Sequence, residues 1–395
     1  QTLTAKYELR NSEKNKLDKS DREFHDWYRF VLSYPPHLVR QYIQEFGLTP
    51  DDIILDPFCG TGTTLIEAKL QNIPSIGIEA NHFAHFASSV KTDWNIYPIA
   101  LMEFAKKIRD KAIKELNKQG IPDNPDLNSE SIIELRKLNA EQEKLILKNS
   151  ISPLPLHKSF VLLDQINKHR TTSFYKYFAV AFGKSLVYQI SNLRFGPEVG
   201  VGKIKTDVSV VETWFKEMTK ICDDLQFSLG KYFAESESIF SDSRNLKNLL
   251  NARKISAVIT SPPYPNEKDY TRTTRLESVM LGFINNKEEL RTLKKSLLRS
   301  NTRGVYQGDN DDDYVKSFPE IQQIAEEIEN RRIELGKTSG FERLYHKVAK
   351  LYFGGVAKHL IELQSILKPN AQLAYVVGDQ ASYLRVMIPT GHLIA

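Results

Sequence analysis

Cysteine is scarce in this chain, whose 395 residues include only two, Cys59 and Cys222. Two thiols are too few for a disulfide framework or a cysteine-rich zinc site, so we expect a metal-free protein of a reducing, cytoplasmic compartment. Long apolar runs are also lacking, and none approaches the roughly 18 to 20 residues that a membrane helix needs. The segment from Gln1 to Ser20 is polar and charged, unlike a secretory signal. The sequence therefore predicts a soluble protein with no membrane partner.

Neither sign of charge dominates the composition. The chain carries 54 Lys and Arg against 49 Asp and Glu, a formal net charge of +5, and its hydrophobic fraction of 41% is ordinary for a globular protein. This balance permits nucleic-acid binding without requiring it, because local clustering of charge matters more than the sum. The length favours one large core with an insertion, or two domains.

Short apolar runs that end in loops predict the strands of an α/β fold. We expect strands at 52–56, 74–79, 238–242, 255–260 and 373–377, and helices at 20–46, 63–69 and 345–367. The strands at 238–242 and 255–260 are expected to be buried. The first two strands with the helix between them form a βαβ unit, which is typical of a parallel sheet covered by helices.

The alternation of strand and helix is interrupted twice. Charged helical patterns such as 101–118 and 129–148 replace it in the first interruption, so we interpret 91–235 as a mainly helical insertion. A second helical excursion covers 266–340. Residues 20–90 and 236–395 then form one discontinuous α/β domain.

A glycine-containing loop joins the first predicted strand to its helix and reads Asp56-Pro57-Phe58-Cys59-Gly60-Thr61-Gly62-Thr63. Doubly wound sheets bind ligands at such loops, where glycine lets the backbone approach closely and the helix start offers N–H groups to an anion. Glu79 and Asp242, which end later strands, could accept hydrogen bonds from ribose hydroxyls and an adenine amine. A tight turn with solvated strand ends is the competing interpretation. The loop is neither GxGxxG nor a P-loop.

This loop resembles the cofactor motif D-P-F-C-G-S/T-G-T of the S-adenosylmethionine-dependent DNA amino-methyltransferases. The resemblance implies a Rossmann-like class I methyltransferase sheet with a large, mainly helical insertion, in which 20–90 and 236–395 form the catalytic domain. It implies that S-adenosylmethionine is the cofactor, that Glu79 holds its ribose and that Asp242 contacts its adenine. It places the loop from Asp56 to Gly62, with Phe58, Gly60 and Thr61, around the methionine portion, and it counts Thr63 among the cofactor-binding residues.

The predicted helix at 27–43, with Tyr34-Pro35-Pro36-His37, resembles the family's helix that closes over the methionine carboxylate. An ordinary helix packed on the sheet would show the same pattern, so both interpretations stay open.

The segment Thr260-Ser261-Pro262-Pro263-Tyr264 follows the fourth predicted strand and resembles the family's catalytic motif S/D/N-P-P-Y/F. An exocyclic amine is a poor nucleophile because its lone pair is delocalised into the base. The Ser261 hydroxyl and the Pro262 carbonyl could accept its two N–H groups, while Pro263 stiffens the loop and Tyr264 offers a face for a flipped base. A Pro-Pro loop without chemistry is the alternative.

Carbon-5 methylation of cytosine requires a cysteine nucleophile, and neither Cys59 in the cofactor loop nor Cys222 in a helical context fits that role. In the family, Ser at the first catalytic position is commonest in cytosine-N4 enzymes, whereas Asp or Asn marks most adenine-N6 enzymes. We therefore favour cytosine N4. Adenine-N6 methylation, RNA amine methylation and a non-catalytic DNA-binding subunit stay as alternatives.

Basic residues follow the catalytic loop directly, and we expect Lys268, Arg272 and Arg275 to contact DNA phosphates. A solvated helical face is the alternative, favoured beyond residue 285. The aromatic and basic stretch 170–205, which includes Arg194, is the candidate for target recognition within the insertion, although aromatic residues at this density also suit a helical core.

The expected partners are double-stranded DNA and a cognate restriction endonuclease, in a prokaryotic cytoplasm. The final strand hairpin of the family pattern is not found before Ala395, so the sequence favours a longer protein.

Overall fold

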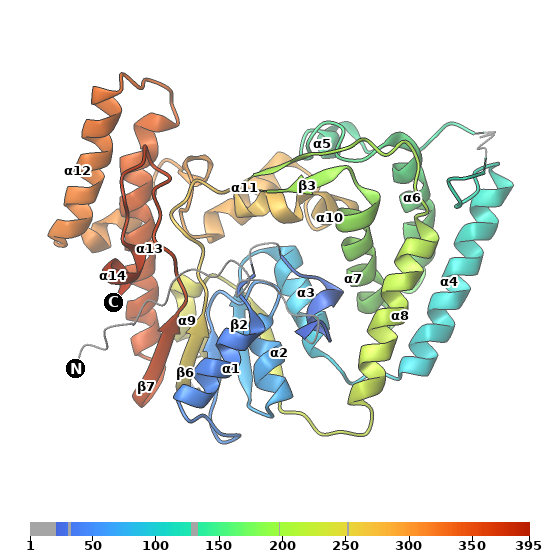
Figure 1. Ribbon diagram of the computed structural model, residues 1–395, viewed down its shortest axis with the longest axis horizontal. Helices are drawn as coiled ribbons and strands as arrows, with labels where there is room; N and C mark the ends of the chain where they lie inside the picture. Colours follow the sequence, from blue (N-terminus) through green and yellow to red (C-terminus); the bar gives the residue numbers. More distant parts are fainter. Residues whose placement is uncertain (1–20, 31–32, 128–132, 197, 251–252) are drawn as a thin grey trace.

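The computed structural model describes residues 21–30, 33–127, 133–196, 198–250 and 253–395 (Figure 1). The strands are β1 (Ile54–Asp56), β2 (Ser75–Glu79), β3 (Leu193–Phe195), β4 (Val199–Val201), β5 (Ser236–Phe240), β6 (Ile255–Thr260) and β7 (Leu367–Tyr375). The helices are α1 (Pro36–Glu45), α2 (Thr63–Leu70), α3 (His82–Thr92), α4 (Pro98–Lys118), α5 (Ala140–Glu143), α6 (Pro153–Asn167), α7 (Tyr175–Ser185), α8 (Val211–Ser228), α9 (Leu246–Leu250), α10 (Arg275–Met280), α11 (Lys287–Ser296), α12 (Pro319–Glu334), α13 (Tyr345–Gln364) and α14 (Thr390–Ile394).

A five-stranded sheet in the order β5-β2-β1-β6-β7 forms the centre of the fold. Its described pairs are all parallel, with Ile54 beside Ser75 of β2 on one side and Ala257 of β6 on the other. Chain order reverses between β1 and β6. In doubly wound sheets this reversal opens a crevice at the carboxyl ends of the two strands, where ligands bind. The predicted α/β class is confirmed.

Both faces of the sheet are covered by helices. Successive strand residues point to opposite sides, and the strands carry apolar residues on both. Ile54 and Ile259 pack with Val39 and Ile43 of α1 and with Ala68 of α2. On the other face, residues of the strands pack with α9 and α13 through Leu55, Ile76, Ile78, Val258, Leu246, Leu250 and Leu363. The result is a three-layer arrangement that leaves the carboxyl ends of the strands open for a site.

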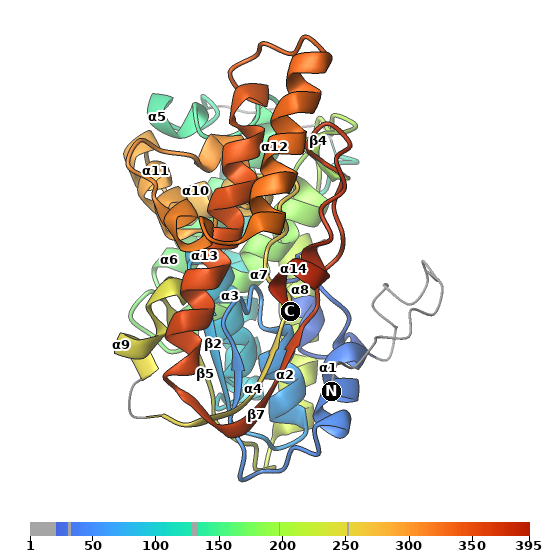
Figure 2. The same ribbon diagram turned by 90° about the vertical axis from the view of Figure 1, so that its left-hand side faces the viewer.

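The region between β2 and β5 is mainly helical. Helices α4, α6, α7 and α8 pack against one another beside the sheet (Figures 1 and 2). Their core is continuous with Phe83, Ala87 and Val90 of α3, and α3 in turn contacts the edge strand β5. Asp123 caps α8 by accepting the backbone N–H groups of Val210 and Val211 at 2.8 and 3.0 Å.

The segment between β6 and α13 includes a tight contact with α13 itself. The 3-10 turn Asp311–Val315 lies directly on α13, where a Cβ on Gly354 would stand 1.9 Å from the Asp311 carbonyl oxygen. Only glycine fits this approach. Helix α12 packs beside α13, and the pair extends beyond the sheet in Figures 1 and 2.

Several predicted elements differ from the structure. The helix expected over 20–46 begins only at Pro36, because Pro35 takes an extended conformation and a residue before proline disfavours the helical region. A separate 3-10 turn covers His25–Trp27. In 129–148 the described residues contain only α5, since this stretch has few apolar positions to bury, and residues 128–132 lie outside the described chain.

The remaining differences concern strands. β5 forms the edge of the sheet and is not buried, and the Phe240 side chain is 46% exposed. β7 runs from Leu367 to Tyr375, earlier than the expected 373–377. The stretch 170–205 contains an unpredicted antiparallel pair, β3 and β4. Its aromatic residues Tyr177, Phe178 and Phe182 on α7 are fully buried, as core packing requires.

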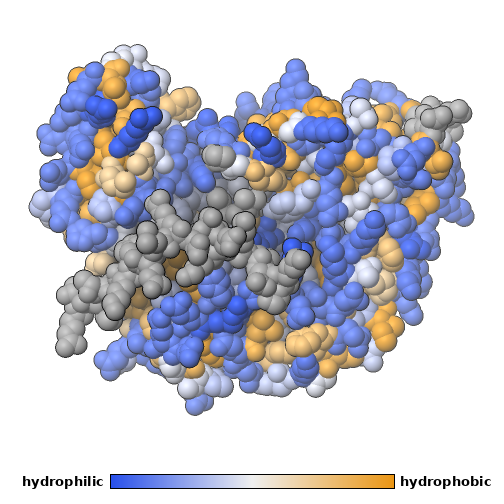
Figure 3. Space-filling view, viewed as in Figure 1, coloured by the Kyte–Doolittle hydropathy of each residue, from blue (hydrophilic) through white to orange (hydrophobic). Residues whose placement is uncertain are grey.

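Within the described residues, every helix is too short or too polar to cross a membrane. The face seen in Figure 3 is mostly hydrophilic, with hydrophobic residues in separate patches.

Candidate active site

The loop between β1 and α2 owes its shape to glycine and to a buried lysine behind it. Gly60 (φ 53°) and Gly62 (φ 86°) take left-handed conformations that side chains disfavour. The Nζ of Lys91 on α3, which is fully buried, donates to the carbonyl oxygens of Thr61 and Tyr28, each at 2.8 Å. The loop is therefore fixed from α3 as well as from its own strand.

Glu79, at the end of β2, turns its carboxylate toward this loop. Its Oε2 accepts the Gly60 N–H at 2.9 Å and its Oε1 accepts the Asn81 N–H at 2.7 Å. Burial raises the pKa of Glu79 to about 7, although both N–H donors favour the ionised form. The carboxylate is thus held in place while retaining lone pairs for further donors.

Asp56 lies behind the loop and joins it to β6. The hydroxyl of Thr64 on α2 donates to its Oδ2 at 2.5 Å, and that of Thr260, the last residue of β6, donates to its Oδ1 at 2.6 Å. The Phe58 N–H donates to Oδ1 at 3.1 Å. Burial raises the pKa of Asp56 to about 6 against these three donors. Asp56 therefore connects the two loops from inside the protein.

The segment Ser261–Tyr264 leaves the carboxyl end of β6. The Ser261 hydroxyl donates to the carbonyl oxygen of Val376 at 2.9 Å, and its Oγ lies 3.3 Å from the Tyr264 Oη. The Tyr264 N–H donates to the hydroxyl of Tyr270 at 3.0 Å. Both ends of the segment are thus anchored, one to the residue after β7 and the other to the 3-10 turn Tyr270–Thr274.

One cavity of about 200 Å³ joins these features at the sheet's reversal point. The predicted residues that line it are Phe58, Gly60, Thr61, Thr63, Glu79, Ser261, Pro262, Pro263, Tyr264 and Lys268. Phe30 and Tyr34, which precede α1, line it too. Asp56 and Gly62 do not line it: Asp56 is fully buried behind the loop, and Gly62 packs on Ser88.

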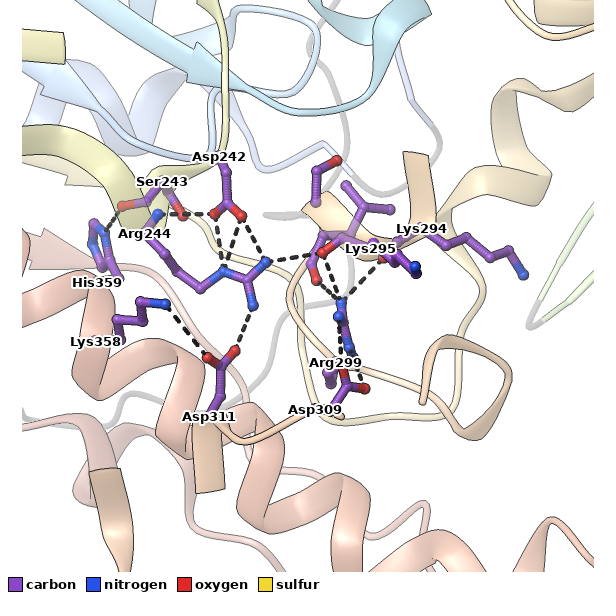
Figure 4. A network of polar contacts seen from close by, with 12 residues as sticks. Asp242, Ser243, Arg244, Lys294, Lys295, Arg299, Asp309, Asp311, Lys358 and His359 are labelled. Atoms are coloured by element: carbon purple, nitrogen blue, oxygen red, sulfur yellow. Dashed lines mark hydrogen bonds and ion pairs between the residues drawn. The ribbon is translucent and has the colours of Figure 1, made fainter. Parts of the chain in front are cut away.

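Asp242 lies in a neighbouring ion-pair network (Figure 4). Its carboxylate accepts the Arg244 Nε at 3.0 and 3.1 Å and the Nη2 at 2.6 Å. Arg244 also pairs with Asp311. Ser241 and Ser243 line the cavity on either side of Asp242 in the chain, but the Asp242 side chain does not. The structure thus places Asp242 beside the cavity with its carboxylate turned to Arg244.

A second arginine in this network shapes the cavity wall. Arg299 donates to both carboxylate oxygens of Asp309 at 2.9 Å and to the carbonyl of Leu297 at 2.6 Å, beyond the end of α11. It is only 5% exposed, so the expectation of a solvated face beyond residue 285 is wrong for Arg299. These bonds hold the segment Ser296–Gly304, part of which lines the cavity.

The four predicted DNA contacts differ in their availability. Lys268 at the cavity wall and the exposed Arg194 have no ion pair or hydrogen bond from their side chains within the described chain. Arg272 pairs with Glu198 at 3.3 Å. Arg275 is mostly buried and donates to the Leu145 carbonyl at 3.2 Å. Lys268 and Arg194 are therefore the freest of the four for phosphates.

Comparisons with known proteins bear on this geometry. Residues 3–88, which include the loop at 56–63, match the family model described as DNA methylase. The chain is similar to the Type II methyltransferase M.BsoBI of Geobacillus stearothermophilus, 26% identical over 94% of this chain and 77% of that protein. It is also similar to the Type II methyltransferase M.AvaI of Nostoc sp. and Anabaena variabilis, 23% identical over 92% of this chain and 75% of each relative. No solved structure matches.

The resemblance to the DNA amino-methyltransferases is confirmed. Residues of the loop at 56–63 and of the segment at 261–264, on which the resemblance rests, line one cavity.

Beside the family's motif residues, the site uses His359 of α13, which the sequence analysis missed. Its Nδ1 lies 3.0 Å from the Ser243 carbonyl, which can only accept, so Nδ1 carries the proton and Nε2 accepts the Tyr375 hydroxyl at 2.6 Å. Burial lowers the pKa of His359 to about 4, so the ring is neutral. It packs edge-on to Phe58 of the loop between β1 and α2, with ring centroids 5.0 Å apart.

No local motif marks His359, Lys91 or Arg299. In the sequence, His359 and Lys91 look like ordinary polar helix residues, and Arg299 lies in the irregular segment after α11.

Proposed function

We propose that this chain is an S-adenosylmethionine-dependent DNA methyltransferase of the Type II kind, and that it methylates the N4 amine of cytosine. The observation that carries the proposal is the shared cavity, in which the cofactor loop and Glu79 face the segment Ser261–Tyr264. The similarity to Type II methyltransferases supports the same reaction class.

The orientation of the Ser261 hydroxyl suits an amine substrate. Because its proton is donated to the Val376 carbonyl, the oxygen presents lone pairs to its other neighbours. An exocyclic amine carries two N–H donors, which Ser261 Oγ and the Pro262 carbonyl would accept. Holding both donors localises the nitrogen lone pair and aims it, while Tyr264 offers an aromatic face for the flipped base.

The residues around the cofactor loop fit S-adenosylmethionine. The Thr61 hydroxyl oxygen is buried without a partner within the described chain, and α2 begins at Thr63 without a side-chain cap. Such a helix start suits the methionine carboxylate, and the Glu79 carboxylate suits the ribose hydroxyls. When bound, the cofactor supplies an electrophilic methyl group on a sulfonium.

The choice of cytosine rests on Ser261. Its hydroxyl is a neutral acceptor, whereas most adenine-N6 members of the resembled family have Asp or Asn at this position. Cys59 lines the cavity, but its side chain is buried against Ser88 and Ser238. Burial raises the pKa of its thiol, which disfavours the thiolate that carbon methylation needs.

The test is to incubate the protein with methyl-labelled cofactor and unmethylated DNA, or RNA, and to identify the modified nucleoside by mass spectrometry. We expect N4-methylcytosine in DNA. N6-methyladenine would reject the choice of base while keeping the reaction class. Modification of RNA alone, or of neither nucleic acid, would reject the proposal. A Ser261→Ala sample serves as the control for contaminating activity.

A further inference from the structure

The short antiparallel pair β3–β4, called the ribbon below, stands on a rigid base. Asn192, immediately before β3, is buried and uses every polar group of its backbone and side chain. Its N–H donates to the Ser150 carbonyl at 2.7 Å, its carbonyl accepts the Gly202 N–H at 2.7 Å, and its Oδ1 accepts the Lys205 N–H at 2.8 Å. Its Nδ2 donates to the Asn149 carbonyl at 3.0 Å. Both arms of the ribbon are therefore held at one point of the insertion.

The far end of the ribbon touches the turn that supports the catalytic loop. Glu198 pairs with Arg272 at 3.3 Å. Arg272 belongs to the 3-10 turn Tyr270–Thr274, whose Tyr270 hydroxyl accepts the Tyr264 N–H and whose Tyr270 and Thr273 line the cavity. Figure 1 shows β3 above the sheet, at the end toward which its parallel strands run. The ribbon therefore stands at the side of the cavity where a base would enter.

One face of the ribbon is open. Arg194 on β3 is paired with Gly200 on β4, and directly paired residues of antiparallel strands point to the same face. A Cβ on Gly200 would meet nothing within 4 Å. The stem of Arg194 lies over Gly202, where a Cβ would stand 3.3 Å from the Arg194 Cβ. Arg194 is thus flanked by Gly200 and Gly202, which have no side chains. Another molecule can therefore approach the ribbon backbone closely on this face.

The charge of this face suits a polyanion. The Arg194 guanidinium has no intramolecular partner within the described chain, and neither does the exposed Lys203 side chain. The acidic Glu198 is neutralised by Arg272. The Lys205 Nζ donates to the carbonyls of Gln189 and Ser191, at 2.7 and 2.6 Å. These bonds stabilise the base of the ribbon.

We infer that the β3–β4 ribbon binds the double-stranded DNA beside the target base. The ribbon enters one groove of the duplex, where Arg194 contacts the DNA. The inference rests on the proposed function, because it assigns part of that substrate's binding surface. A two-stranded ribbon fits the major groove, and arginine is a common reader of groove edges and phosphates. The ribbon's contact with Arg272 then sets where the bound duplex lies relative to Tyr264.

The test adds a carboxylate to the open face. Gly200→Glu places a negative charge in space that no protein atom occupies, so the fold should tolerate it. Gln44→Glu adds the same charge at an exposed position near the end of α1, at the amino-terminal side of the sheet, and serves as the matched control. Arg194→Gln is a second variant, whose exposed side chain has no partner to lose within the described residues.

The readouts are methyl incorporation into unmethylated genomic DNA at low DNA concentration, cofactor affinity by calorimetry, and oligomeric state by light scattering. We expect kcat/KM for DNA to fall about tenfold or more in Gly200→Glu through charge repulsion, and to fall in Arg194→Gln. Cofactor affinity should not change in either variant. Gln44→Glu should match the wild type.

Wild-type incorporation in both ribbon variants would overturn the inference. A change of oligomeric state with unchanged kcat/KM for DNA would also overturn it, because the ribbon would then contact a second copy of the chain. Absence of methyl incorporation by the wild type is a separate result, which rejects the proposed function itself.

Discussion

Replacing Thr260 by valine would test the connection between the loop at 56–63 and the segment at 261–264. Valine keeps the shape of the buried threonine and removes only the hydroxyl that donates to Asp56 at 2.6 Å. Asp56 would keep its bonds from Thr64 and from the Phe58 N–H. Because Thr260 directly precedes Ser261, the substitution acts at the start of the catalytic segment without touching its chemistry.

The magnitude follows from the charge state of Asp56. A hydrogen bond to an ionised partner contributes about 1.5–3 kcal/mol, and one to a neutral partner about 1 kcal/mol. The raised pKa of Asp56, about 6, means that the folded carboxylate is ionised above this pH and protonated below it. We therefore expect Thr260→Val to lower the free energy of unfolding by about 1.5–3 kcal/mol at pH 8, and by less at about pH 5.

The sign of this pH dependence can be checked through the pKa itself. Loss of the Thr260 donor raises the folded pKa of Asp56 further, since that bond favours the ionised form. Each unit of rise corresponds to about 1.4 kcal/mol of difference between the effects at high and low pH. The destabilisation must therefore grow as pH rises through the folded pKa values of the two proteins.

The assay is urea unfolding of both proteins at the two pH values, with methyl transfer and cofactor affinity measured in parallel. Thr92→Val is the matched control, because the Thr92 hydroxyl is also buried but donates to the Ser88 carbonyl of its own helix at 2.9 Å. We expect Thr92→Val to lower the free energy of unfolding by less than Thr260→Val, and by the same amount at both pH values. Equal effects of Thr260→Val at both pH values would refute the bridging role of Asp56.

Three further expectations concern single groups. Ser261→Ala should lower kcat about a hundredfold or more while leaving cofactor affinity intact, because the proposed function assigns Ser261 to the base and not to the cofactor; full activity by the labelled-methyl assay would contradict this role. Burial raises the pKa of Glu277 from 4.5 to about 8 in the folded protein, so the free energy of unfolding of the wild type falls by about 1.4 kcal/mol per pH unit between these values. Glu277→Gln removes this loss, and its stability relative to the wild type should therefore increase as pH rises. If the free energies of unfolding of the two proteins, measured by urea unfolding, show the same dependence on pH, the raised pKa of Glu277 is excluded. Lys268→Ala should weaken DNA binding and reduce its salt slope by about one, as measured by fluorescence anisotropy. Arg253→Ala, which removes the same charge just before β6, should leave the slope unchanged.

The positions of the loop at 56–63 and of the segment at 261–264, each at the end of a strand, could be predicted from the sequence because each segment is contiguous. Asp56–Thr63 and Ser261–Tyr264 follow short apolar strands, and the chemistry of each depends on neighbours in the chain. Strand and helix periodicity likewise predicted the α/β class and most of the sheet. The helix expected over 129–148 failed because charge pattern alone does not show what a helix could bury.

Only the tertiary structure decided which polar side chains are engaged in intramolecular pairs and which are available to a ligand. Arg244 reaches Asp311 across 67 residues of sequence, and Arg275 reaches Leu145 across 130, so neither pairing leaves a local pattern. Asp242 turns to Arg244, which is only two residues away in the chain, but that arginine is itself fixed by the distant Asp311. Arg194 is exposed on its ribbon. The sequence determined the residues that can perform the chemistry, because that depends on covalent neighbours. The fold decided their availability, because electrostatic pairing depends on distance in space.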